Sequence, residues 1–150
     1  MVNYLEKYEY CPKIAEIDGA IANISANVDG FMTEDILRKC FSMLDLTSLK
    51  TNDTEATISS LVKKVNSFPA NFPGWPYPAS VCVYPNFASV VRDTRKGDFH
   101  ITVVSACFPS SQSFLDVKLL ECAEAVDNGA DEVDIVLALN AFLAGDYERA

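Results

Sequence analysis

Residues 101–137, ITVVSACFPSSQSFLDVKLLECAEAVDNGADEVDIVL, are the stretch that decides the class of fold. The run Ile101–Ser105 is apolar and rich in β-branched residues, which is typical of a buried strand. Apolar side chains then recur at helical spacing from Gln112 to Asn128, and Gly129 is suited to end such a helix in a left-handed conformation. A second apolar run, Glu132–Leu137, follows. The pattern predicts strand, helix and strand, the unit that joins parallel strands.

The same alternation continues on both sides of this stretch. A short apolar run, Phe41–Leu46, suits a strand, and Asp53 or Thr54 is placed to open a helix. A loop rich in Pro, Phe and Gly spans residues 67–78. The remaining expected elements are a strand at 80–84, a helix at 86–93 and a helix over 142–149. Four strand–helix units therefore follow one another from residue 41.

Two architectures accommodate parallel strands joined by right-handed crossovers: an open doubly wound sheet and a (β/α)8 TIM barrel. No G-x-G-x-x-G and no G-x-x-x-x-G-K-[ST] string follows a strand, so Rossmann and P-loop nucleotide sites lack their signature. The strands are nearly continuous in apolar character, which predicts helices on both faces of the sheet. A barrel needs eight units and about 250 residues. We predict an α/β fold of the TIM-barrel family, represented here by its first four βα units.

Residues 1–40 have a different pattern and are expected to form a peripheral helical extension. Isoleucines recur at helical spacing, and Thr33 is placed to cap a short helix that ends at Cys40. The predicted organisation is therefore an extension at 1–40 and the first half of a barrel at 41–150. The isoleucines of the first helix are Ile14, Ile17, Ile21 and Ile24.

The charge balance and the cysteines narrow the class of protein. Twelve basic and 21 acidic residues give a net charge of −9, which argues against binding to nucleic acid. The five cysteines form no C-x-x-C pair, and their odd number suits a reducing compartment. No apolar leader or membrane-length stretch occurs, so we expect a cytoplasmic protein with no membrane partner. His100 is the only histidine, so a Cys/His zinc site or a Ser-His-Asp triad would have a single imidazole to use. No metal or cofactor is expected.

Four residues in or after the predicted strands are candidates for a site. Asp134 lies in an apolar strand, where a carboxylate is costly unless it is functional or is bonded to backbone or an arginine. Asp45 is expected at the end of the first strand with Thr47 after it, where both could act on a ligand or cap a turn. Cys82 lies in a strand and is more typical of a small apolar residue than of a nucleophile.

Several strings, each at a predicted strand end, resemble the deoxyribose-phosphate aldolase family. The resemblance covers roughly residues 41–150, and residues 1–40 are similar to a helical extension found in some branches of the family. The strings are Leu44–Leu49 with Asp53–Thr54, Val81–Phe87, Phe108–Gln112, Gly129–Val136 and Leu143–Asp146.

The resemblance implies a class I aldolase of carbohydrate and deoxyribonucleotide catabolism. Such an enzyme reversibly cleaves 2-deoxy-D-ribose 5-phosphate, a small sugar phosphate, to acetaldehyde and D-glyceraldehyde 3-phosphate through a lysine Schiff base without a metal. Asp134 matches the catalytic carboxylate. Asp45 and Thr47 match residues at the mouth of the substrate pocket, on the same carboxyl-terminal face as Asp134, and Cys82 matches a pocket-side cysteine.

The sequence also departs from the family pattern. Ala138 and Asn140 stand where relatives commonly carry Asn and Gly, and Ser111 stands where many carry Gly. The resemblance places the Schiff-base lysine and a relay lysine in the sixth and seventh strands, and the phosphate site in the loops after the seventh and eighth. Residues 1–150 contain none of these, so the chain alone is expected to be inactive.

Two other interpretations stay open. One is a non-catalytic half-barrel that works only as an oligomer, such as a homodimer, or with a partner. The other is an unrelated sugar-phosphate enzyme that shares the barrel, because a fold does not fix a function.

Overall fold

The computed structural model describes residues 7, 11 and 13–150, which belong to two compact units. The division falls between Leu37 and Arg38, inside helix α4 (Glu34–Phe41). The assignment of residues 1–40 as an extension to a half-barrel at 41–150 stays a prediction, and its first residues lie largely outside the described ones. No helix of the described part is long and apolar enough to cross a membrane.

The first unit contains helix α2 (Ile14–Ala26), helix α3 (Val28–Phe31) and the start of α4. The helical spacing of the isoleucines is confirmed, although α2 has no buried residue. The expected cap of α4 is also confirmed, because the Ile36 N–H donates to Thr33 Oγ1 at 3.4 Å. Acidic residues in the first turn of α4 and basic residues in its last turn suit the helix dipole.

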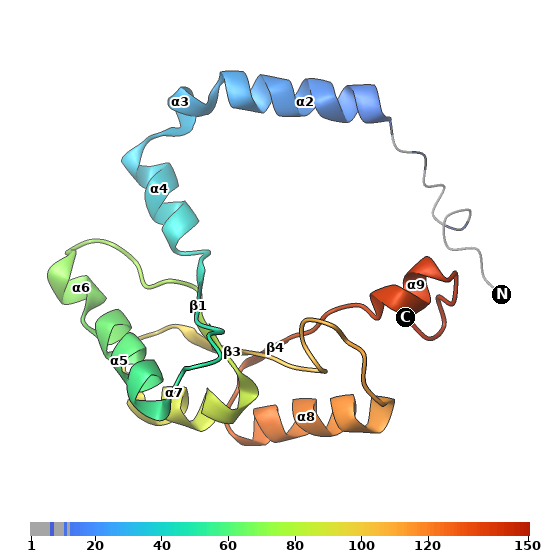
Figure 1. Ribbon diagram of the computed structural model, residues 1–150. Coiled ribbons are helices and arrows are strands. Elements are labelled where there is room, and N and C mark those ends of the chain that lie inside the picture. The colour runs from blue at the N-terminus through green and yellow to red at the C-terminus, as the bar shows by residue number, and fades with distance from the viewer. Residues whose placement is uncertain (1–6, 8–10, 12) are drawn as a thin grey trace. The chain divides into compact units, whose positions relative to one another are not determined.

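The second unit is built on a four-stranded parallel sheet in the order β1-β2-β3-β4 (Figure 1). The parallel pairing and the order confirm the prediction of consecutive strand–helix units. The strands are β1 (Asp45–Thr47), β2 (Ser80–Val83), β3 (His100–Val104) and β4 (Glu132–Asp134). The helices are α5 (Glu55–Asn66), α6 (Phe68–Asn71), the 3-10 helix η1 (Pro85–Phe87), α7 (Ala88–Thr94), α8 (Leu115–Asp127) and α9 (Leu139–Leu143).

Local sequence explains where two of the crossover helices begin and end. Thr54 caps α5 through a reciprocal pair of bonds: the Thr57 N–H donates to Thr54 Oγ1 at 3.2 Å, and the Thr54 N–H donates to Thr57 Oγ1 at 2.8 Å. Gly129 follows α8 with φ of +103°, the left-handed conformation expected of a residue that ends a helix. The start of a helix at Asp53 or Thr54 and the end of the later helix at Gly129 were predicted from the residue types, whereas the bond pair with Thr57 was not.

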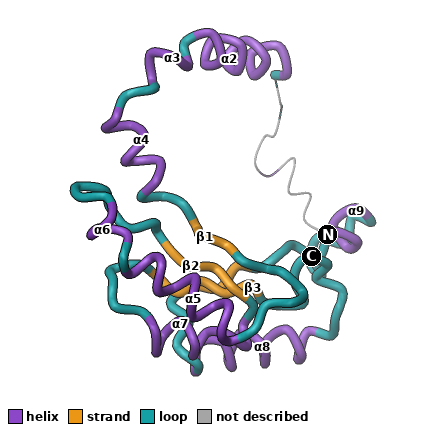
Figure 2. Tube along the Cα trace, turned by 60° about the vertical axis from the view of Figure 1, so that its left-hand side comes forward, coloured by secondary structure: helices purple, strands orange, loops and turns teal. Residues whose placement is uncertain are grey.

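One face of the sheet forms the hydrophobic core with the crossover helices. Helices α5, α7 and α8 lie on the same side of the strands (Figure 1 and Figure 2). The strand residues on this face are fully buried and pack against Ile58 and Val62 of α5, Val91 of α7 and Ala125 of α8. These strand residues are Val81, Val83, Ile101 and Val103.

The expectation that helices cover both faces is wrong. Strands that follow one another in chain order through right-handed crossovers place every crossover helix on one side. A doubly wound sheet needs a reversal of strand order, and β1-β2-β3-β4 has none. The opposite face carries mainly polar side chains instead.

Several predicted boundaries are also wrong. Phe41 belongs to α4, because its ring stacks on Phe68 at 4.7 Å between centroids and meets Trp75 edge-on. The strand therefore begins at Asp45 rather than ending there. The predicted loop at 67–78 contains the short helix α6.

The last strand and helix also differ from the prediction. β4 ends at Asp134 instead of Leu137, because its partner strand β3 ends at Val104, which pairs with Asp134. After β3 the chain turns away from the sheet through Ala106 and Cys107, both with positive φ. The final helix α9 comes earlier than expected, at Leu139–Leu143.

Candidate functional site

The four predicted site residues share the polar face of the sheet. In the parallel register Asp45 pairs with Ser80, Thr47 pairs with Cys82, and Asp134 pairs with Val104. Cys82 also pairs with Thr102, and Thr102 pairs with Glu132. Paired residues project to the same face, and residues two apart in a strand do so too. The structure thus gathers carboxylates, hydroxyls and a thiol on one surface.

The expectation that Asp45 and Asp134 lie together at the carboxyl ends of their strands is wrong. Asp45 is the first residue of β1 and lies in one row with Ser80 and His100. Asp134 is the last residue of β4 and lies beside Val104. The two carboxylates therefore share a face but occupy opposite ends of the strands, because β1 begins later than the sequence suggested.

Asp45 is held in a defined orientation at the start of its strand. Its Oδ1 atom accepts a hydrogen bond from Ser80 Oγ at 2.8 Å, and Ser80 is fully buried. The Thr47 hydroxyl donates to the Asp45 backbone carbonyl at 3.0 Å. A carboxylate fixed by a buried hydroxyl is suited to positioning and charge balance.

Cys82 lies at the centre of the polar face and is buried. Burial raises the pKa of its thiol above the usual value. A hydrogen bond with Thr47 lowers this pKa, but the effect of burial is larger. Neighbouring carboxylates raise the pKa further, because negative charge disfavours the thiolate; they are Asp134, Asp45 and Glu132. The thiol therefore stays protonated at neutral pH, which agrees with the interpretation that Cys82 is not a nucleophile.

Two aspartates three residues apart have contrasting surroundings. Asp131 Oδ2 accepts from Arg95 Nη1 at 2.7 Å and from the Ile101 N–H at 2.9 Å. Partial burial opposes ionisation of Asp131, but these donors outweigh it and hold the pKa of the carboxyl below its usual value. Asp134, by contrast, accepts a bond from the Ser105 N–H at its backbone carbonyl, at 2.9 Å. Among the described residues, no hydrogen bond or ion pair engages the Asp134 carboxylate.

This contrast bears on the two explanations of an acidic residue in an apolar strand. The structural role, a carboxylate bonded to backbone and an arginine, is filled by Asp131. Asp134 lies at the carboxyl end of β4, where the active sites of TIM barrels are found, and its side chain is exposed. The geometry leaves its carboxylate available to a ligand.

A second polar cluster at the start of β3 was missed by sequence reasoning. Glu132 Oε2 accepts from the Thr102 hydroxyl at 2.6 Å, and Glu132 Oε1 lies 2.7 Å from His100 Nδ1. The bond to Glu132 raises the pKa of His100, and the bonds from Thr102 and His100 lower the pKa of Glu132. Alternation of polar and apolar residues in Glu132–Asp134 was the available signal for this cluster.

The arrangement supports proton transfer but supplies no amine. None of the four strands contains a lysine or an arginine. The polar face offers an exposed carboxylate, hydroxyls and a neutral thiol, which can accept, donate or orient protons. An electrophilic or Schiff-base group on this face would come from elsewhere in the protein.

Comparison with known proteins finds aldolases among those that the chain resembles. No model of a protein family matches the chain. A Caenorhabditis elegans protein named as a deoxyribose-phosphate aldolase is 34% identical over 137 residues, which are 89% of this chain and 45% of that protein. The chain is a relative of the deoxyribose-phosphate aldolases. It spans about half the length of this relative.

Solved structures agree with this relationship. The aldolase QR15 is 29% identical with a TM-score of 0.63, and the match covers 72% of this chain and 44% of QR15. A Coccidioides immitis structure named as a deoxyribose-phosphate aldolase is 24% identical with a TM-score of 0.61, and the match covers 75% of this chain and 41% of the Coccidioides immitis chain. This second match supports the fold. The fold is that of TIM-barrel aldolases, and this chain covers less than half of the solved aldolase chains that it matches.

Proposed function

We propose that the chain is part of a class I aldolase that reversibly cleaves 2-deoxy-D-ribose 5-phosphate to acetaldehyde and D-glyceraldehyde 3-phosphate. The observation that carries the proposal is the Asp134 carboxylate, exposed at the carboxyl end of β4 and without a hydrogen-bonding or ionic partner among the described residues. The relationship to aldolases supports the reaction class.

In this proposal Asp134 moves the proton that carbon–carbon cleavage requires. A lysine Schiff base would withdraw electrons from the breaking bond, and the negative charge on the polar face would stabilise the protonated imine. Asp45 would balance charge and Thr47 would offer its hydroxyl to the substrate. The Schiff-base and relay lysines, as well as the phosphate site, would lie in sequence that follows residue 150, so we expect residues 1–150 alone to be inactive.

The test uses a longer protein in which this chain is joined to the matching carboxyl-terminal part of the Caenorhabditis elegans relative. Asp134→Asn should lower kcat by about 10²-fold or more, the usual effect of losing an acid–base group. Borohydride trapping with substrate should still give an adduct, because the amide is nearly isosteric with the carboxylate. Asp131→Asn is the matched control and should lower stability while retaining most of the activity.

Two outcomes would contradict the proposal. One is turnover close to that of the unchanged protein in Asp134→Asn, which would return Asp134 to a structural role. The other is a borohydride adduct on a lysine of residues 1–150 together with turnover by this chain alone. Steady-state kinetics measures the first outcome, and peptide mass mapping of the trapped protein identifies the modified lysine in the second.

A second candidate function is a non-catalytic half-barrel that acts as an oligomer. Within the described sheet, β1 and β4 each have one neighbouring strand, so each leaves a row of backbone groups unpaired. Helix α8 also exposes large apolar side chains, including Leu115, Leu119 and Val126. Sedimentation velocity of the 150-residue chain would show a homodimer or larger species under this hypothesis.

The proposed reaction also suggests a cellular compartment and a pathway. We propose a cytoplasmic enzyme of deoxyribonucleotide and carbohydrate catabolism whose partner is a small sugar phosphate. Fractionation of cells that express a tagged full-length protein would test the compartment. Accumulation of deoxyribose 5-phosphate on gene deletion would test the pathway.

A further inference from the structure

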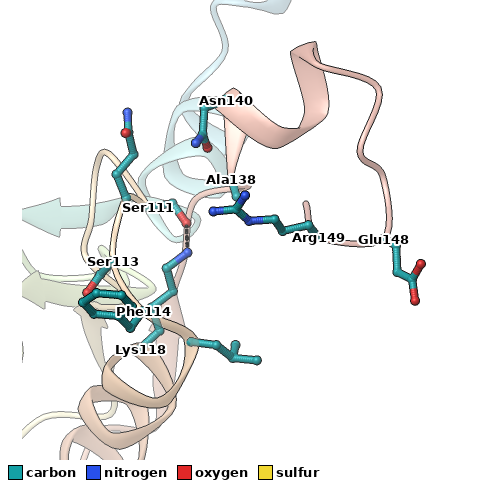
Figure 3. A pocket seen from close by; sticks show the side chains of 10 residues that line it. Ser111, Ser113, Phe114, Lys118, Ala138, Asn140, Glu148 and Arg149 are labelled. Atoms are coloured by element: carbon teal, nitrogen blue, oxygen red, sulfur yellow. Dashed lines mark hydrogen bonds between the residues drawn. The ribbon is translucent and has the colours of Figure 1, made fainter.

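A cavity of about 580 Å³ lies beyond the carboxyl ends of β3 and β4, and none of the four predicted site residues lines it. Its walls come from the loop after β3, the first turns of α8 and the segment that contains α9 and the residues after it (Figure 3). The volume is in the range of small-molecule sites.

Two basic side chains meet in this cavity. Lys118 Nζ donates to Ser111 Oγ at 2.8 Å, and the Arg149 side chain extends toward the same two residues (Figure 3). Glu148 also lines the cavity, but its carboxylate points away from them (Figure 3). Among the described residues, neither Lys118 nor the Arg149 guanidinium forms an ion pair.

Acidic residues outnumber basic ones by 21 to 12 in the chain, and some of the basic side chains form an ion pair with a carboxylate. Arg92, Arg95 and Lys13 do so. Two cations that share a cavity without a carboxylate between them produce a local positive potential, which attracts an anion.

Ser111 has a backbone conformation that calls for an explanation. Its φ is +55°, in the left-handed region that is unfavourable for residues other than glycine, and its side chain is buried. Such conformations are found at ligand sites, where the surroundings hold them in place. Here the conformation presents the Ser111 hydroxyl to Lys118 and to the cavity.

The remaining lining defines the chemistry of a ligand. Ser113 and Asn140 add a hydroxyl and an amide to the two cations, so donors are arranged around the cavity in several directions. A tetrahedral phosphate, with its three terminal oxygens, matches such a set better than a planar carboxylate does. Phe114 and Leu115 are exposed apolar side chains at the same cavity and can contact the carbon part of a ligand.

We propose that this cavity binds the phosphate group of a small phosphorylated molecule, through Lys118, Arg149 and Ser111. The site does not depend on the proposed aldolase activity, since none of these residues lies on the polar face of the sheet. Ser111, Ala138 and Asn140, at which the sequence departs from the aldolase pattern, all line the cavity.

The experiment is a ligand-observed ³¹P NMR titration of the 150-residue chain with inorganic phosphate at constant ionic strength. This measurement works whether the chain is a monomer or an oligomer. Lys118→Gln and Arg149→Gln should each weaken phosphate binding by roughly tenfold or more, the effect of losing a charged hydrogen bond. Lys39→Gln, which removes one exposed charge outside the cavity, should leave the affinity unchanged.

Ser111→Gly separates binding from folding. Glycine adopts the left-handed conformation without strain, so the thermal midpoint should not fall, while loss of the hydroxyl should weaken phosphate binding several-fold. The proposal is overturned if Lys39→Gln weakens binding as much as Lys118→Gln, or if Ser111→Gly binds phosphate as tightly as the unchanged chain. Competition by acetate at the same concentration as phosphate would overturn the assignment to a phosphate group.

Discussion

The two faces of the sheet use the same strands for different purposes. On the helix-covered face, the side chains of Val81, Ile101 and Val103 are fully buried against α5, α7 and α8. On the polar face, the neighbouring residues Cys82 and Thr102 belong to a surface of hydroxyls, a thiol and carboxylates. Because alternate residues of a strand point to opposite faces, adjacent positions can serve stability and chemistry separately.

The largest expected effect comes from the helix-covered face. Ile101→Ala should lower the free energy of unfolding by about 2–5 kcal/mol, because it leaves a cavity in the core. Thr102→Ala, one residue later on the polar face, removes a hydrogen bond to Glu132 and should cost only about 1 kcal/mol. Urea unfolding followed by circular dichroism measures both. Equal losses of unfolding free energy in the two variants would mean that the helix-covered face does not contribute more to stability than the polar face.

The second prediction concerns the reactivity of the polar face. Cys82 should react with iodoacetamide roughly tenfold more slowly than the exposed Cys40 at pH 8, since burial and neighbouring carboxylates disfavour its thiolate. Mass mapping of alkylated peptides over time measures the two rates. If Cys82 reacts as fast as Cys40, the polar face is more open than the structure shows.

The third prediction sharpens the comparison of Asp131 and Asp134. Asp131→Asn should lower the free energy of unfolding by about 1 kcal/mol, because it weakens the bond to Arg95; this figure is kept small because both side chains are partly exposed. Asp134→Asn should change the free energy of unfolding by less than about 0.5 kcal/mol. The folded-state pKa of Asp131 is lowered, so its contribution is present above the ordinary value of 3.8 and is lost as the pH falls. Thermal unfolding at pH 7 and pH 3 should show the difference between Asp131→Asn and the unchanged chain shrinking at pH 3.

The smallest expected effect is the pH dependence of the His100–Glu132 pair. The folded-state pKa of His100 is raised, so its contribution is present below the ordinary value of 6.5 and is lost as the pH rises through the folded pKa. The difference in Tm between the unchanged chain and His100→Gln should therefore be larger at pH 6 than at pH 9. A difference that grows with pH would contradict the assigned pair.

Local signals predicted much of the fold. The capping pair of α5 depends on Thr54 and Thr57, and the end of α8 depends on Gly129, so both could be recognised within a few residues. The start of β1 could not, because Phe41 is held in α4 by aromatic contacts with Phe68 and Trp75, which lie far along the chain. Boundaries set by such long-range packing are not visible in a local pattern.

The candidate site was predicted in part, for a similar reason. Asp134 stood out as an acidic residue in an apolar strand, and its lack of a hydrogen-bonding or ionic partner among the described residues agrees with a role toward a ligand. Ser80 and Glu132 were overlooked, because each strand was treated as a continuous apolar run and the alternation that places both on one face was not used. The cavity around Lys118 could not be foreseen, since its lining comes from segments that meet only in the folded chain.

The order of the strands in the sheet has a consequence for how the protein is made. Each strand pairs with the one synthesised just before it, so no strand has to wait for a partner that is translated much later. Domains fold progressively as they leave the ribosome. β1 and β2 can pair before β4 has been translated, and each new strand–helix unit can add its helix to a core that already exists. Pauses in translation between these units would therefore leave partly built sheets that are already native in their pairing.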